Sequence, residues 1–239
     1  MKKFIVIFCI FISCVFASQN EWSDSLDGII KVLPIVENKK IIALSLDLCG
    51  GKTDGFDERL VEFLEKNDIK ATFFVSYRWI KKYPKYFERI YKNPLFEIEN
   101  HGTKHKPASV DGKSIYGLKG TKNPAELSDE INKNANLIAQ ITLKRPKFYR
   151  SGGAYYDKKA IEQIYKMGLK PIGFSILADG GATFSANRIK KEILKSKNGD
   201  IIIAHANRPQ KQIAQGLILG ISILRANGFE FVRLDEVLE

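Results

Sequence analysis

The feature that most constrains the fold is a regular alternation of strand-like and helix-like segments after residue 40. Such alternation is typical of parallel strands joined by helical crossovers. Seven repeats can close into an incomplete barrel or stay open as a doubly wound α/β sheet, and the pattern favours the barrel. The predicted strands are residues 41–48, 71–75, 95–98, 148–149, 171–177, 201–204 and 229–232.

Helical spacing of apolar residues predicts the segments between these strands. Helices are expected over residues 56–67, 79–91 and 158–167. Asn123 and Pro124 form a cap and first-turn pair, so a further helix should begin there.

The first residues have the composition of a secretory signal. Lys2 and Lys3 precede an apolar run over residues 4–16, followed by residues that a signal peptidase tolerates. The run is too short to span a bilayer comfortably, so a cleaved signal over residues 1–17 is favoured over an anchor. We therefore expect an exported protein, periplasmic or extracellular, without a stable membrane span in the mature chain. A lipoprotein anchored through Cys14 is the minor alternative.

The remaining chain is expected to consist of a lead-in at residues 18–40 and one domain at residues 41–239. Two of the three cysteines lie in the signal segment, so the mature chain would keep only Cys49 and no internal disulfide. Removing residues 1–17 would lower the formal net charge from +11 to +9, and this basic balance suits an anionic envelope polymer and nucleic acid equally. Because exported proteins rarely meet nucleic acid, we expect no such partner. The alternative is that the lysines bind no polymer and only keep the helix surfaces solvated. Protein partners stay unknown.

Polar residues gather where the predicted strands end. Asp47, Arg150 and His205 end strands, and His101 and Asp179 follow strands. The carboxyl ends of parallel strands meet at one face, where functional sites are built. All three histidines of the chain lie at or beside such ends. The sequence therefore predicts one site at this face.

Two of these histidines are spaced for metal binding. His101 and His105 form an H-x-x-x-H pair, and Gly102 indicates a loop or short turn. Either geometry can bring two ring nitrogens to one ion. A catalytic zinc needs about three protein ligands and an open position for water. The third ligand should be a carboxylate, and Asp54 and Asp57 follow the first strand.

The other polar residues suit acid and base roles. Asp47 can take a proton from water on the metal, and His205 can protonate a leaving amine. Arg150 can hold Asp47 ionised through a charge-assisted pair, and Asp179 can orient His205 and raise its pKa.

Three nearby features each allow two interpretations. The turn at residues 151–154 either presents N–H groups to an oxyanion or is an ordinary strand-to-helix turn. Tyr155 and Tyr156 are either walls of a sugar groove or core residues. Cys49 is either a nucleophile or a small apolar packing residue.

The order of these residues resembles that of the NodB-homology polysaccharide deacetylases, also called carbohydrate esterase family four. The resemblance covers about residues 41–235, and its histidine block at residues 101–105 is the most specific. The other blocks are residues 45–47, 149–153, 178–180 and 203–205, and residues 71–75 resemble the second strand of the family. The resemblance implies a distorted (β/α)7 barrel, a divalent metal (usually zinc) and N-deacetylation of an acetylated amino-sugar polymer, here of the cell envelope.

The sequence departs from the family at the third metal ligand. The family usually places a second aspartate directly after the base, and here Leu48 occupies that position. The following turn is longer than usual, so Asp54 could reach back to the metal. The resemblance thus implies His101, His105 and Asp54 as ligands.

Two rival functions remain. The first is a catalytically impaired protein that binds glycans in the same groove, and the intact acid and base argue against it. The second is a related amidohydrolase acting on a small cyclic amide or ureide, and the export signal argues against it.

Overall fold

The computed structural model describes residues 21–238. The predicted signal peptide at residues 1–17 lies outside the described residues. Among the described helices, none combines the length and the apolar character needed to cross a bilayer.

A parallel sheet of eight strands forms the centre of the protein. Its order is β10-β11-β2-β3-β4-β7-β9, and β12 pairs with β2 outside that path. The strands are β2 (Ile41–Leu48), β3 (Ala71–Val75), β4 (Phe96–Asn100), β7 (Phe148–Tyr149), β9 (Lys170–Pro171), β10 (Ile176–Leu177), β11 (Ile201–His205) and β12 (Glu230–Val232).

The sheet curls because its two outer strands belong to one short stretch of chain. At one edge β9 pairs with β7, and at the other β10 pairs with β11, so residues 172–175 connect the two edges. The strand predicted over residues 171–177 is therefore two strands, split where the chain crosses between the edges. The start of β2 pairs with β12 and its end with β3, along the edge opposite β11. The result is the predicted distorted (β/α)7 barrel.

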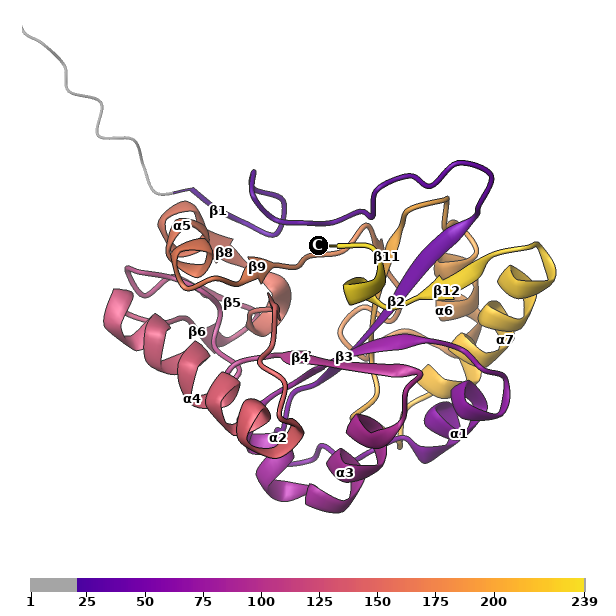
Figure 1. Ribbon diagram of the computed structural model, residues 1–239, viewed down its shortest axis with the longest axis horizontal. Coiled ribbons are helices and arrows are strands. Elements are labelled where there is room, and N and C mark those ends of the chain that lie inside the picture. Colours follow the sequence, from indigo (N-terminus) through magenta and orange to yellow (C-terminus); the bar gives the residue numbers. More distant parts are fainter. Residues whose placement is uncertain (1–20, 239) are drawn as a thin grey trace, which may run out of the picture.

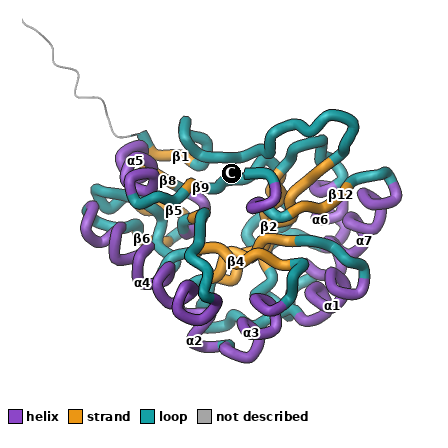
Figure 2. Tube along the Cα trace, in the orientation of Figure 1, coloured by secondary structure: helices purple, strands orange, loops and turns teal. Residues whose placement is uncertain are grey.

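Helices cover the strands on the left, lower and right sides of the view, as the tube in Figure 2 shows. In Figure 1 they form the outer rim on these sides, with β2, β3 and β4 inside, and the lead-in runs along the upper side from β1 to β2. They are α1 (Glu58–Lys66), α2 (Tyr77–Lys82), α3 (Pro84–Lys92), α4 (Pro124–Thr142), α5 (Lys158–Lys166), α6 (Ala186–Ile193) and α7 (Ile213–Ala226), with 3-10 turns η1 (Gly152–Ala154) and η2 (Leu234–Glu236).

Two helix predictions had different outcomes. The predicted start of α4 is confirmed, since the Asn123 side chain accepts a hydrogen bond from the Glu126 N–H and Pro124 is the first helical residue. The single helix predicted over residues 79–91 is wrong, because the chain forms α2 and α3 instead. Pro84 begins the second helix, where its missing N–H and fixed φ are tolerated.

The described part of the lead-in packs along the barrel. Strand β1 (Trp22–Ser23) pairs antiparallel with β8 (Tyr156–Asp157). Further along, the Leu33 N–H donates to the Gly199 carbonyl at 2.7 Å, and the Leu33 side chain is buried.

Side chains of β2 alternate between two environments. Ile42, Leu44, Leu46 and Leu48 lie in the apolar layer between sheet and helices. The intervening side chains face the barrel interior, where Ile41 and Ala43 pack with residues of other strands. Ser45 and Asp47 share this interior face, so the barrel changes from apolar to polar toward the carboxyl ends of the strands. In the same alternation the interior receives Thr72, Phe74, Glu97, Glu99, Ile203 and His205.

Two interior carboxyl groups lie side by side on β4. Glu97 Oε2 accepts hydrogen bonds from Thr72 Oγ1 and from the Leu234 N–H, whereas Oε1 has no partner among the described residues. Burial raises the pKa of Glu97 to about 7, and nearby Asp235 adds to the increase while the Thr72 hydrogen bond opposes it. Burial and the charge of Glu97 also raise the pKa of Glu99 well above its usual value.

We expect this pair to make the protein less stable as the pH rises. A native pKa of about 7 for Glu97 favours the protonated form, so its contribution is fully present below about pH 4.5 and is lost as the pH rises through about 7. The increase in the pKa of Glu97 from 4.5 to about 7 corresponds to a loss of about 3 kcal/mol in the free energy of unfolding across this pH range. Urea unfolding measures the free energy of unfolding at pH 5 and at pH 8. Between these two pH values Glu97→Gln should lose less of it than the parent does.

The exposed Glu62 supplies the matched control. Glu62→Gln should lose as much stability between pH 5 and pH 8 as the parent does. An equal loss in Glu97→Gln and the parent would show that Glu97 does not titrate in this range.

Candidate active site

Arg150 holds Asp47 at the carboxyl end of β2. Its side chain is fully buried, and Nη1 donates to Asp47 Oδ1 at 2.9 Å. Nη2 donates to Ser45 Oγ at 2.8 Å and to the Gly173 carbonyl at 2.9 Å, and the guanidinium stacks over the Phe74 ring. The structure therefore brings together the predicted Arg150–Asp47 pair and leaves Asp47 Oδ2 directed toward the rest of the site.

His205 and Asp179 form a second pair beside the first. His205 ends β11 in register with Asp47 of β2, and its Nδ1 lies 2.9 Å from Asp179 Oδ2. The same carboxyl oxygen accepts the His205 backbone N–H at 2.8 Å. Burial lowers the pKa of His205, but the charge and hydrogen bond of Asp179 and the neighbouring Cys49 hold it well above its usual value. Burial raises the pKa of Asp179, and His205 outweighs this effect and lowers it.

His101 directs one ring nitrogen into the site. Its Nδ1 lies 2.8 Å from the Arg150 carbonyl, which can only accept, so Nδ1 carries the proton in the neutral ring. Its Nε2 lies 3.5 Å from Asp47 Oδ2 and 3.6 Å from Cys49 Sγ. Burial lowers the pKa of His101, but the charge of Asp47, with Cys49 and the Arg150 carbonyl, raises it above its usual value. These surroundings favour positive charge at Nε2.

The loop that carries the two histidines is fixed by Glu130 of α4. Its Oε1 accepts the backbone N–H groups of Lys104 at 2.7 Å and Lys106 at 3.0 Å. A Cβ at Gly102 would lie 2.6 Å from the same oxygen, and the φ of 77° also favours glycine, so a larger residue would be strained and would displace the Glu130 carboxylate. His105 has a left-handed φ of 59°, which these contacts on both sides help to hold.

Glu130 was not among the residues predicted from the sequence. It lies on the buried face of α4, and its neighbour one turn along, Asn134, donates to the Asn100 side chain and to the Val75 carbonyl. The sequence pattern that could have indicated it is the pair Glu130 and Asn134, two polar residues four apart on the apolar face of α4 that also carries Leu127 and Ile138.

Cys49, His101 and His105 form a compact group of metal-binding residues. One ligand atom from each lies within 4.8 Å of the others, and residues 21–238 contain no second group of this kind. Burial raises the pKa of the Cys49 thiol, but His105, His101 and His205 outweigh it and hold the pKa well below its usual value. One sulfur and two imidazole nitrogens are a donor set that zinc favours, so the residues present fit a divalent metal.

Asp54 lies outside this group. Its Oδ2 accepts from Asn207 Nδ2 at 2.5 Å, and its Oδ1 pairs with Arg208 Nη2 at 3.0 Å. Asp57, the other carboxylate considered, pairs with Arg59. The structure thus does not bring Asp54 to the histidines as expected, because the chain after β11 binds its carboxylate, and the residue that it places there is Cys49.

The turn at residues 151–154 supports the histidine loop rather than an oxyanion. The Gly152 N–H donates to the Lys106 carbonyl at 3.1 Å, and a Cβ at Gly152 would lie 2.2 Å from the His105 carbonyl. The N–H groups of Ser151 and Ala154 are also bonded within the protein. The geometry favours the structural interpretation of this turn.

The two tyrosines after this turn have different environments. Tyr156 is a core residue, and its Oη donates to the Ile172 carbonyl at 3.0 Å. Tyr155 instead contacts Trp22 and Tyr116, with ring centroids 5.5 Å and 5.7 Å away. Tyr116 is 73% exposed at the tip of the hairpin of β5 (Ser114–Ile115) and β6 (Leu118–Lys119). We call Trp22, Tyr116 and Tyr155 the aromatic cluster.

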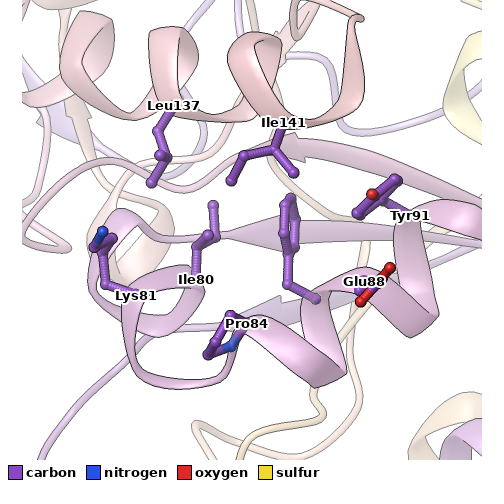
Figure 3. A pocket seen from close by; sticks show the side chains of 8 residues that line it. Ile80, Lys81, Pro84, Glu88, Tyr91, Leu137 and Ile141 are labelled. Carbon is purple, nitrogen blue, oxygen red and sulfur yellow. The ribbon is translucent and has the colours of Figure 1, made fainter.

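A separate apolar hollow lies on the outside of the barrel. Figure 3 shows it between α4 and the helices α2 and α3. Its volume is about 370 Å³, and its lining includes Ile80, Phe87, Leu137 and Ile141. None of the predicted site residues lines this hollow.

The sequence matches the polysaccharide deacetylase family over residues 35–172, more than half of the chain. The peptidoglycan-N-acetylmuramic acid deacetylase PdaA of Bacillus subtilis is 20% identical over 84% of this chain and 72% of its own. Its structure, a family 4 carbohydrate esterase, has a TM-score of 0.72 at 19% identity, covering 88% of this chain and 85% of its own.

Two other solved structures have the same fold. A CE4 family pseudoenzyme from Bacillus anthracis has a TM-score of 0.69 at 20% identity, covering 84% of this chain and 66% of its own. A family 4 acetyl xylan esterase from Clostridium thermocellum, in complex with a cobalt ion, has a TM-score of 0.68 at 21% identity, covering 82% and 89%. At these identities the likeness establishes the fold, and it confirms the predicted barrel.

Proposed function

Because the chain belongs to the polysaccharide deacetylase family, we propose that it is a metal-dependent enzyme that removes N-acetyl groups from an amino-sugar polymer of the cell envelope. One observation carries this proposal. Asp47 and His205, in register on neighbouring strands, lie beside the compact group that includes His101 and His105. A base, an acid and metal-binding residues thus share one end of the barrel.

We propose zinc as the metal, held by His101, His105 and one further protein donor. Imidazole nitrogen is a common zinc ligand, and the family 4 esterase from Clostridium thermocellum binds cobalt, which zinc sites accept. When bound, a divalent cation polarises the acetyl carbonyl and lowers the pKa of water.

The protein side chains then divide the proton transfers. Asp47 Oδ2 accepts the proton of the attacking water, since Oδ1 is occupied by Arg150. The buried Arg150 guanidinium stabilises the ionised carboxylate. His205 donates a proton to the departing amine, and Asp179 holds its ring through Nδ1, which leaves Nε2 for the substrate.

The aromatic cluster supports a sugar substrate. Tyr155 directly follows the turn that packs on the backbone of the histidine loop, so this turn connects the cluster to the proposed centre. Exposed aromatic rings can cover the apolar faces of sugar rings while their polar edges stay wet. The name of the relative PdaA, a peptidoglycan deacetylase, points to the same class of polymer.

An envelope substrate also requires export, which we propose on the basis of the sequence. Residues 1–17 combine two lysines with an apolar run, as secretory signals do. Without the two lysines of residues 1–17 the formal net charge falls from +11 to +9, which still suits an anionic polymer at the cell surface.

We expect the full chain to release acetate from N-acetylglucosamine oligomers. A chelator should abolish the release, and zinc or cobalt should restore it, because the carbonyl is not polarised without the metal. Acetate is measured by an enzyme-coupled assay, with His101→Ala as the inactive comparison.

A negative result would separate the two rival functions. Binding of the oligomers without acetate release, in the presence of either metal, would favour a glycan-binding protein that lacks turnover; the fold also occurs in a CE4 family pseudoenzyme from Bacillus anthracis. Release of ammonia from small cyclic amides or ureides, with no activity on oligomers, would favour the related amidohydrolase.

A further inference from the structure

We propose that the thiolate of Cys49 is the third protein ligand of the metal centre. It takes the place of the carboxylate that the family usually supplies at the position of Leu48. The proposal rests on the proposed function for the presence of a divalent metal. It adds a sulfur donor, which shifts the preference of the site toward zinc and away from magnesium or manganese.

The alternation along β2 explains why residue 49 and not residue 48 can serve. Leu48 is fully buried in the apolar layer between the sheet and the helices, so its side chain points away from the barrel interior. Cys49 follows two residues after Asp47, and two residues restore the same side of an extended chain. Leu48 therefore cannot supply a ligand, whereas the next residue, Cys49, can.

The backbone of Cys49 is fixed in this orientation. Its carbonyl accepts the Ser76 hydroxyl at 2.7 Å, and Ser76 is itself buried at the start of α2. Gly50 has a φ of 77°, and a Cβ there would lie 2.6 Å from the Trp79 nitrogen. Only glycine fits this turn without displacing the backbone of α2, so the chain leaves the strand in one way.

The distances suit a shared ion. Cys49 Sγ lies 3.6 Å from His101 Nε2, and the ligand atoms of Cys49, His101 and His105 all lie within 4.8 Å of one another. Sulfur and nitrogen ligands of a tetrahedral zinc lie about 3.5 Å apart, given the usual bond lengths. The other ring nitrogen of His101 is bonded to a backbone carbonyl, as in most metal-binding histidines.

The other interpretations of Cys49 fit the surroundings less well. An apolar packing residue would have apolar neighbours, whereas the Cys49 thiol faces imidazole nitrogens. A nucleophile must be free to attack substrate, whereas Cys49 Sγ lies 3.6 Å from His101 Nε2, among the metal-binding side chains. Asp54, the expected ligand, is held by Asn207 and Arg208.

Cobalt(II) reports directly on sulfur ligation, because a bound thiolate gives a near-ultraviolet charge-transfer band. The test uses the full chain with Cys9→Ser and Cys14→Ser, so that Cys49 is the only thiol. We expect this chain to bind cobalt and to show the band. Cys49→Asp should bind cobalt without the band. The matched control Asp54→Asn, which alters the carboxylate expected from sequence, should keep both.

Two results would overturn the proposal: cobalt bound to the Cys49 chain without the band, or the same band in Cys49→Asp. The cobalt spectra need no substrate, so they are independent of turnover. A charge-transfer band without acetate release would support Cys49 as a ligand and contradict the proposed deacetylase activity. Metal-dependent acetate release without a band would support the deacetylase activity and contradict Cys49 as a ligand.

Discussion

Replacing Asp47 by asparagine should lower kcat by about 10²–10⁴-fold, the usual contribution of a positioned general base. Asparagine has the same shape, and its Oδ1 can still accept the hydrogen bond from Arg150. It cannot take a proton from water, so the chemical step slows while KM for the oligomer changes little. Steady-state acetate release, together with the metal content of each sample, measures this effect.

Asp54→Asn is the matched control, because Asp54 is also a buried carboxylate paired with an arginine. It should retain kcat within a few fold. If Asp47→Asn keeps the full kcat with metal bound, Asp47 is not the base and the proposed mechanism is wrong.

Replacing Arg150 by methionine should destabilise the protein by about 3–5 kcal/mol, the usual result of removing one partner of a buried ion pair. The guanidinium donates to Asp47, Ser45 and the Gly173 carbonyl, and all three acceptors would stay buried. Methionine fills most of the volume, so the loss would come from unpaired polar groups rather than from a cavity. Urea unfolding at pH 7 measures the free energy of unfolding.

A second variant tests the cause. Adding Asp47→Asn to Arg150→Met removes the unpaired charge, so the double variant should regain part of the lost stability. Arg145→Met, at an exposed arginine near the end of α4, should change stability by less than about 0.5 kcal/mol. A loss in Arg150→Met no larger than in Arg145→Met would show that the pair does not support the fold.

The fold could be predicted from local pattern because each strand and helix carries its own periodicity. The start of α4 at Asn123 and Pro124 depends on residues adjacent in sequence, and it was predicted correctly. The break between α2 and α3 at Pro84 was equally local and was missed, because apolar spacing continues across it. The division of residues 171–177 into β9 and β10 was not local, since it follows from closing the barrel.

The sequence by itself determined which residues could meet. Asp47, His101, Arg150 and His205 lie at strand ends, and parallel strands bring their ends to one face whatever the details of packing. Only the tertiary structure decided between Asp54 and Cys49. That choice depends on contacts distant in sequence, namely Asn207 and Arg208 holding the Asp54 carboxylate, Ser76 holding the backbone of Cys49 and Glu130 holding the histidine loop. Periodicity assigns a side chain to a face, but a ligand set requires distances, which only the packed chain sets.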